Sequence, residues 1–177
     1  KGLLLYGAAG CGKRYLARKV AEEAGCRFME AGPANLYGEG SRKFSRLESM
    51  LRVAARKAPV VLYIEEIHLL APRLDLTDAA AACELLGLLN DIRLEKICLV
   101  GGSRWPDLVD PALIRDALSR SCRVPLPALS VREEVLKRLL DHRNPAESLD
   151  YTSLAGEMDG YTLVELVQLA ETAASQA

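Results

Sequence analysis

The chain has 177 residues, of which 50% are apolar and 27% are charged, the composition of an ordinary globular protein. Its formal net charge of −1 gives no electrostatic basis for direct binding to nucleic acid or to an anionic membrane. The longest apolar runs, such as Val60–Ile64 and Ala79–Cys83, are far shorter than the ~20 residues of a membrane-spanning helix, so no membrane insertion is expected.

Short apolar runs alternate with longer segments of helical periodicity up to about Leu126. This alternation predicts an α/β fold, with a mostly parallel five-stranded sheet flanked by helices. Strands are expected at Leu3–Tyr6, Arg27–Glu30, Val60–Ile64, Ile97–Val100 and Cys122–Leu126, and helices at Arg14–Ala24, Arg42–Lys57, Asp78–Leu94 and Pro111–Leu118. In the second helix, the spacing predicts a buried face of Phe44, Leu47, Leu51, Ala54 and Ala55.

The pattern changes after Pro125 and Pro127, where strands stop and three helical segments follow. Ser130–Glu133 and Thr162–Glu165 both have the sequence of a capping box, and Asp159-Gly160 has that of a turn. We therefore expect an α/β domain over residues 1–127 and a small helical domain over residues 128–177. Both chain ends have the appearance of cuts through a larger protein.

A glycine-rich segment joins the first strand to the first helix: Gly7, Ala8, Ala9, Gly10, Cys11, Gly12 and Lys13, which fits the pattern G-x-x-x-x-G-K. Glycines let the backbone amides converge on a phosphate at a helix start, and Lys13 supplies positive charge to the β- and γ-phosphates. A turn with a purely structural role is the alternative. The register of the lysine favours nucleotide binding.

The next residue departs from that pattern, which requires a serine or threonine hydroxyl as a ligand of Mg²⁺. Arg14 stands there instead, and a guanidinium has no lone pair for a metal. Arg14 either pairs with a phosphate oxygen, which would give nucleotide binding with weakened use of Mg²⁺, or it turns to solvent.

Two carboxylates, Glu65 and Glu66, follow the apolar strand Val60–Ile64. Chemistry in parallel sheets is carried at the carboxyl ends of strands, so this pair should face the glycine-rich loop. One carboxylate would orient Mg²⁺ and the other would polarise the attacking water as a general base. A solvated loop start is the alternative.

Several segments resemble the AAA family, which includes the valosin-type, NSF-type and katanin/spastin-type ATPases. They are Lys1–Gly7, Ala58–Arg73, Asp107–Leu113 and the lid-like stretch Asp150–Tyr161. The resemblance runs in order through nearly the whole chain and specifies no single member. It implies a P-loop NTPase fold with a helical lid, ATP or ADP as ligand, and neighbouring AAA subunits in a hexameric ring that remodels proteins.

The resemblance also implies roles for single residues. Gly7–Lys13 would bind phosphates, Glu65 would hold Mg²⁺, and Glu66 would activate water. Arg120 lies where the family's second arginine finger reaches the neighbouring subunit's γ-phosphate, although a plain surface arginine is the alternative.

Departures from the family pattern cluster on the hydrolysis apparatus. Arg14 replaces the metal-binding hydroxyl, and Glu65 replaces the usual aspartate. Arg104 occupies the polar sensor position, where it could pair with Glu66 and hold this base away from water. Ala117 or Leu118 occupies the first arginine-finger position, Leu163 replaces a small lid residue, and Tyr37 is the one aromatic side chain left in a shortened pore loop.

These departures predict nucleotide binding with weak turnover. The alternatives are a non-hydrolysing structural subunit of an AAA ring and, with less support from the lid segment, a small-molecule P-loop kinase. Five cysteines without a CxxC pair predict buried thiols in a reducing compartment, and we expect an intracellular location, cytoplasmic or nuclear. The two histidines, His68 and His142, have no spacing to cysteines that would predict a zinc site.

Overall fold

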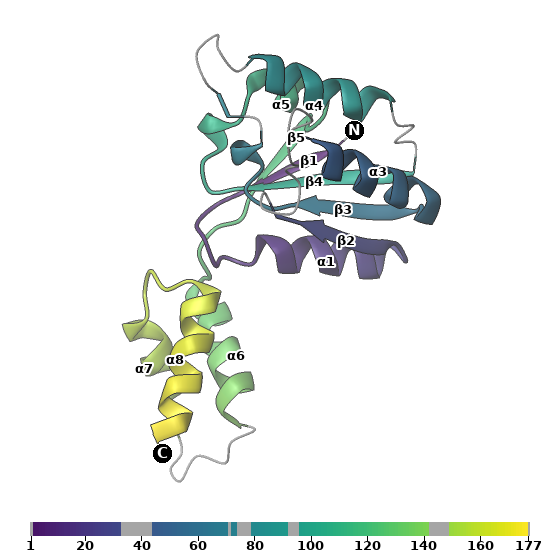
Figure 1. Cartoon of the computed structure of the whole chain (residues 1–177). Coiled ribbons are helices and arrows are strands. Elements are labelled where there is room, and N and C mark those ends of the chain that lie inside the picture. Colours follow the sequence, from purple (N-terminus) through teal and green to yellow (C-terminus); the bar gives the residue numbers. More distant parts are fainter. Residues whose placement is uncertain are drawn as a thin grey trace. The chain divides into compact units, whose positions relative to one another are not determined.

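The computed structural model describes residues 2–32, 44–70, 72–73, 79–91, 96–141 and 149–176 (Figure 1). Its contacts divide the chain into two compact units. The sheet unit comprises Lys1–Tyr6 and Lys13–Arg123, and the helical unit comprises Gly7–Gly12 and Val124–Ala177. The glycine-rich loop thus groups with the helices that follow it more than a hundred residues later, which the linear sequence does not suggest.

The sheet has five strands in the order β2-β3-β4-β1-β5, and every neighbouring pair is parallel. The strands are β1 (Leu3–Tyr6), β2 (Arg27–Ala31), β3 (Val60–Ile64), β4 (Ile97–Ser103) and β5 (Arg120–Arg123). All five side chains of the interior strand β3 are buried, as expected for a strand covered on both faces. The predicted α/β fold with a parallel five-stranded sheet is therefore confirmed.

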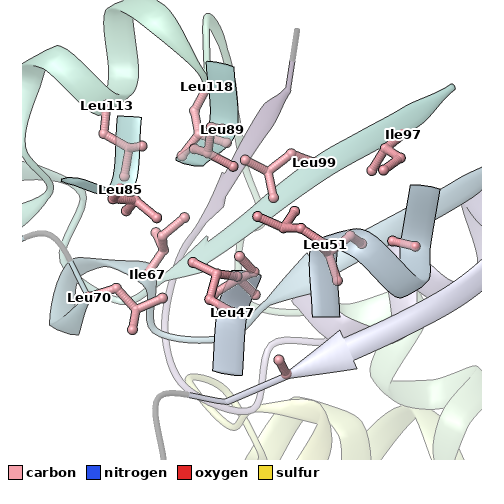
Figure 2. Close-up of a cluster of buried hydrophobic side chains, with 14 of the residues drawn as sticks. Leu47, Leu51, Ile67, Leu70, Leu85, Leu89, Ile97, Leu99, Leu113 and Leu118 are labelled. Atoms are coloured by element: carbon pink, nitrogen blue, oxygen red, sulfur yellow. The ribbon is translucent and has the colours of Figure 1, made fainter. Parts of the chain in front are cut away.

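The helices that the structure describes in the sheet unit are α1 (Lys13–Glu23), α3 (Ser45–Lys57), α4 (Ala79–Asp91) and α5 (Pro111–Asp116), with short 3₁₀ turns η1 (Ile67–Leu69) and η2 (Pro106–Leu108). Leucines of α3 and α4 pack with one face of the sheet into the main core, which Figure 2 shows around Leu51, Leu85 and Leu99. Val60, Leu62 and Ile64 belong to this core, so the alternating Val61 and Tyr63 point to the other face. Helix α1 contacts β2, β3 and β4.

Two local predictions for the sheet unit are wrong. The last strand is Arg120–Arg123, not Cys122–Leu126, because it pairs with β1 from Leu3 onward and Pro125 has no amide hydrogen to continue a ladder. All four side chains of β5 are exposed, so the strand cannot be located by searching the sequence for an apolar run. On α3, Phe44, Leu47, Leu51 and Ala54 are buried as predicted, whereas Ala55 is exposed.

The helical unit contains α6 (Leu129–Leu140), α7 (Tyr151–Glu157) and α8 (Leu163–Gln176), which confirms three helical segments after the sheet. Leu136, Ala155 and Leu166 form its core. The buried guanidinium of Arg132 fastens this bundle: its Nε donates to the Ala155 carbonyl at 2.9 Å, and its Nη1 donates to the Pro127 carbonyl at 2.9 Å.

One predicted capping box is confirmed and the other is wrong. Thr162 N donates to Glu165 Oε2 at 2.8 Å, and Glu165 N donates in return to Thr162 Oγ1 at 3.3 Å. The Thr162 amide and the Thr162 hydroxyl both donate to the Glu165 carboxylate and lower its pKa. Helix α6, however, begins at Leu129 with Ala128 as its cap residue, so Ser130 lies inside the helix. Gly160 has φ +83°, as the predicted turn at Asp159-Gly160 requires.

The cysteines lie in the described part of the chain and form no disulfide there. Cys11 is buried and Cys26 is half-buried, but Cys83, Cys98 and Cys122 are exposed, so the prediction of buried thiols is wrong for these three. None of the helices within the described ranges is long and apolar enough to cross a membrane.

Candidate functional site

The glycine-rich loop has a backbone that only glycine accommodates at its ends. Gly7 has φ +154°, and a β-carbon there would lie 2.2 Å from the Val124 carbonyl oxygen. Gly12 has φ +95°, also in the region that L side chains avoid. These positions give the loop the tight turn that a phosphate cradle needs before a helix start, so the residues present fit a nucleotide polyphosphate.

The start of α8 packs against this loop within the helical unit. Val164 N donates to the Gly10 carbonyl at 3.3 Å, and a β-carbon on Gly10 would lie 2.9 Å from Thr162 Oγ1. A β-carbon on Gly12 would lie 3.1 Å from Leu163 Cδ1. Leu163, identified in the sequence as larger than the usual residue at this point, therefore lies directly on the loop.

The two residues after the loop begin α1. The Lys13 side chain is buried, whereas Arg14 is 58% exposed and its Nη1 lies 3.6 Å from Glu30 Oε1. Arg18 Nη2 approaches the other oxygen of Glu30 at 3.2 Å. Arg14 is therefore exposed and also forms an ion pair with Glu30, a partner that the sequence did not suggest.

A polar cavity of about 270 Å³ lies at the carboxyl ends of β2 and β3. Its lining brings together the predicted residues Arg14 and Glu65 with Glu30, Tyr63, Ala31 and Gly32. Glu65 is anchored there because its amide donates to the Ala31 carbonyl at 2.9 Å. Sequence reasoning missed Glu30, although this residue, like Glu65, is a carboxylate at the end of a parallel strand.

Glu66 is held on both carboxylate oxygens. Arg104 Nε lies 3.0 Å from Oε1, while the Arg104 amide donates to Oε2 at 3.4 Å. His68 Nδ1 lies 3.3 Å from Oε2. The backbone of Glu66 is left-handed, with φ 48° and ψ 50°, a conformation uncommon outside glycine. The predicted pairing of Arg104 with Glu66 is confirmed; the catalytic roles of both residues stay predictions.

His68 and Ser103 extend this network into the interior, and sequence reasoning missed both. His68 is 5% exposed and Ser103 is fully buried, with Ser103 Oγ 2.9 Å from His68 Nδ1. Burial lowers the pKa of His68, the neighbouring Glu66 raises it and Arg104 lowers it. Polar residues just beyond β3 and at the end of the adjacent β4 were the available signal, because neighbouring parallel strands end at one edge of a sheet.

The remaining predicted residues are dispersed. Arg120 lies on the exposed edge strand β5 and makes no ion pair with any residue that the structure describes. At the first arginine-finger position, Leu118 is fully buried and Ala117 is partly buried, so neither presents a charge. Tyr37 lies outside the described residues.

Curated relatives match almost the whole chain. It is 35% identical over 184 residues to the ATPase family gene 2 protein of Saccharomyces cerevisiae, covering 98% of this chain and 23% of that protein. It is 31% identical over 185 residues to the human outer mitochondrial transmembrane helix translocase, with 98% and 50% covered. A third relative is the ATP-dependent zinc metalloprotease FTSH 11, chloroplastic/mitochondrial, of Arabidopsis thaliana, 31% identical over 186 residues, with 100% and 23% covered.

These relatives correct the expected location. Two of the three carry mitochondrial or chloroplast names, so the expectation of a cytoplasmic or nuclear protein is wrong. The cysteine pattern, on which that expectation rested, does not specify where in the cell a folded domain is located. The chain also spans only 23% to 50% of the length of these relatives.

A family comparison agrees with the geometry of the loop and the sheet. Residues 3–126 match the AAA family, described as the ATPase family associated with various cellular activities. This match begins at β1 and ends just beyond β5, so it includes the loop, both acidic residues and Arg104. The chain belongs to the AAA family.

Proposed function

We propose that this chain is the ATP-binding module of a ring-forming AAA ATPase that remodels proteins, with hydrolysis restrained at its general base. The observation that carries the proposal is the ion pair of Arg104 with Glu66, in which Arg104 Nε lies 3.0 Å from Glu66 Oε1. A general base must accept a proton from water, and a carboxylate oxygen that is already paired with a guanidinium accepts it poorly.

AAA membership implies nucleotide binding, usually with Mg²⁺. In the proposal, the amides of Gly7–Gly12 and the Lys13 ammonium bind the phosphates. Glu65 offers oxygen ligands of the type that Mg²⁺ prefers, but Arg14 offers none. When bound, Mg²⁺ would neutralise charge on the phosphates; we expect it to be held by Glu65 and more weakly than in relatives that have the hydroxyl.

The two compact units are proposed to be the large α/β domain and the lid domain of such a module, with their division near residues 123–127. Arg120, exposed at the sheet edge, is proposed to serve the site of the adjacent subunit in a hexamer. The protein substrate would be recognised by segments other than this core.

A second candidate is a structural module that binds nucleotide and does not hydrolyse it. The ion pair between Arg14 and Glu30 favours it, because that pair occupies the cavity wall from which a metal-binding hydroxyl is missing. In this case bound nucleotide would stiffen contacts between subunits without turnover.

Nucleotide titration tests the shared part of both candidates. ATP should bind the wild-type chain and lose affinity in Lys13→Ala, while Lys19→Ala, an exposed lysine paired with Glu22 on the same helix, serves as the matched control. Equal affinity in Lys13→Ala and the wild type would refute the phosphate-loop assignment.

Single-turnover hydrolysis separates the two candidates. Slow hydrolysis in the wild type that disappears in Glu66→Gln supports the ATPase. Turnover that appears only in Arg14→Thr supports the structural module. Glu48→Gln, which changes a half-buried helical glutamate in the same way, controls for a general effect of charge removal.

A further inference from the structure

We propose that His68 and Ser103 are positioning residues for Glu66: the His68 ring donates from Nδ1 to Glu66 Oε2, and Ser103 fixes that ring. This inference rests on the proposed role of Glu66 as general base. In this inference His68 and Ser103 orient the Glu66 carboxylate, whereas Arg104 restrains it.

The three side chains form a continuous polar chain that runs from the partly exposed Glu66 to the buried His68 and Ser103. The Trp105 amide donates to Ser103 Oγ at 3.0 Å, Ser103 Oγ lies 2.9 Å from His68 Nδ1, and Nδ1 lies 3.3 Å from Glu66 Oε2. Main chain at the end of β4 therefore positions the ring, and the ring positions the carboxylate that follows β3. Buried polar groups joined in this way fix side-chain orientation, since each unmade bond would leave a polar atom without water.

The contacts of Nδ1 determine which ring nitrogen carries the proton. Ionised Glu66 can only accept hydrogen bonds. If Nδ1 had a lone pair, it would face the carboxylate oxygen at 3.3 Å and repel it. A hydrogen on Nδ1 can instead be shared between Glu66 Oε2 and Ser103 Oγ. The geometry therefore favours neutral His68 with its proton on Nδ1.

The two arms that hold Glu66 differ in their exposure. The Arg104 side chain is 46% exposed, whereas that of His68 is 6% exposed. Solvent screening weakens the Arg104 arm and leaves the His68 arm strong. Removing Arg104 should therefore release the outer oxygen, Oε1, for water, while His68 and Ser103 keep the carboxylate aimed.

A test in the Arg104→Asn background uses this difference. Adding His68→Leu should lower the single-turnover rate by roughly tenfold to a hundredfold, the usual cost of a misplaced catalytic group, with ATP affinity unchanged within about twofold. Adding His68→Asn should restore most of the rate, because an asparagine amide can donate from nearly the position of Nδ1. Adding Ser103→Ala should lower the rate, whereas Ser103→Thr should preserve it.

A purely structural role predicts a different pattern. Loss of ATP affinity in parallel with the rate, no recovery with His68→Asn, or an unchanged rate in His68→Leu would each overturn the proposal. Failure of the proposed function is distinguishable, because in that case the Arg104→Asn parent would bind no ATP or would keep its hydrolysis after Glu66→Gln.

Ring-nitrogen NMR gives a readout that needs no turnover. The chain has two histidines, so in His142→Gln the remaining imidazole signals belong to His68. We expect a protonated Nδ1 and an unprotonated Nε2 at neutral pH, with a shifted Nδ1 signal in Glu66→Gln. A proton on Nε2, or a Nδ1 signal that does not respond to Glu66→Gln, would overturn the proposal.

Discussion

Arg104 Nε lies 3.0 Å from Glu66 Oε1, in a pair whose arginine is 46% exposed and whose glutamate is 17% exposed. Exposed ion pairs are worth about 0–1 kcal/mol, so this contact restrains the carboxylate without fixing it permanently. Anything that offers Arg104 a better acceptor, such as a phosphate, would compete for it.

Removing this arginine should accelerate hydrolysis. Arg104→Asn deletes the guanidinium and leaves the buried contact with His68, so we expect the single-turnover rate to rise on the order of tenfold, given that a positioned general base contributes about 10²–10⁴-fold. Arg52→Asn, which removes an exposed arginine paired with Glu48 on α3, should leave the rate unchanged. An unchanged rate in Arg104→Asn would show that the pair does not limit turnover.

The dependence of nucleotide binding on metal should be weak in the wild type and restored by a hydroxyl. Arg14 provides no ligand for Mg²⁺, so ATP should bind with similar affinity in Mg²⁺ and in EDTA. Arg14→Thr should tighten binding in Mg²⁺ alone. Nucleotide titrations in Mg²⁺ and in EDTA measure this dependence on metal. Arg18→Thr is the control, because it also removes a partner of Glu30. Strong Mg²⁺ dependence in the wild type would contradict it.

A methyl group on Gly102 should destabilise the sheet unit. A β-carbon there would lie 2.2 Å from Tyr63 Oη and 2.8 Å from Tyr63 Cζ. Overpacking of this kind costs about 1–3 kcal/mol, which Gly102→Ala should show in urea denaturation. Adding Tyr63→Phe should recover part of the loss. Gly87→Ala, in α4 with nothing within 4 Å of the new carbon, should instead gain about 0.5–1 kcal/mol.

Stability should fall in mild acid because of His68. Burial lowers the pKa of His68 below its ordinary value of about 6.5. Between the two pKa values, His68 is therefore protonated in the unfolded chain and neutral in the folded chain. The contribution of neutral His68 to the free energy of unfolding is complete above pH 6.5. It is lost as the pH falls from there through the lowered pKa, by at most about 1.4 kcal/mol per pH unit. Urea midpoints measured from pH 8 to pH 5 should show a smaller decline in His68→Asn; His142→Gln separates the two histidines.

An effect on the adjacent subunit is expected for Arg120. If it is an arginine finger, Arg120→Ala should keep ATP binding and lower hydrolysis by about 10³-fold or more, provided that the rate is first raised by Arg104→Asn. Arg115→Ala, an exposed arginine paired with its neighbour Asp116, is the control. A mixed assembly in which Arg120→Ala subunits keep their own activity and silence their neighbours would locate the effect at the interface. A normal rate would remove Arg120 from it.

Local chemistry made much of this protein predictable. The spacing of apolar residues is enough to place β1 and β3, because a strand buried on both faces must be apolar throughout. The capping box of α8 was also predictable, since Thr162 and Glu165 complete each other's hydrogen bonds within one turn. Arg120–Arg123 shows the limit: an exposed edge strand is held by its ladder with β1 and has no apolar pattern to reveal it.

By itself, the sequence determined the α/β class, the family and the glycine-rich loop, because these depend on residue type and on separations of a few positions. Only the tertiary structure decided that Arg14 pairs with Glu30 and that Leu163 contacts Gly12. The same is true of the contacts that link Ser103 to His68 and His68 to Glu66. Each of these contacts joins residues on different elements, and within the sheet unit the parallel strands bring Glu30, Glu66 and Ser103 to a common edge. Which partner a charged or polar side chain then meets depends on distances of a few ångström, and the order of residues along the chain does not encode those distances directly.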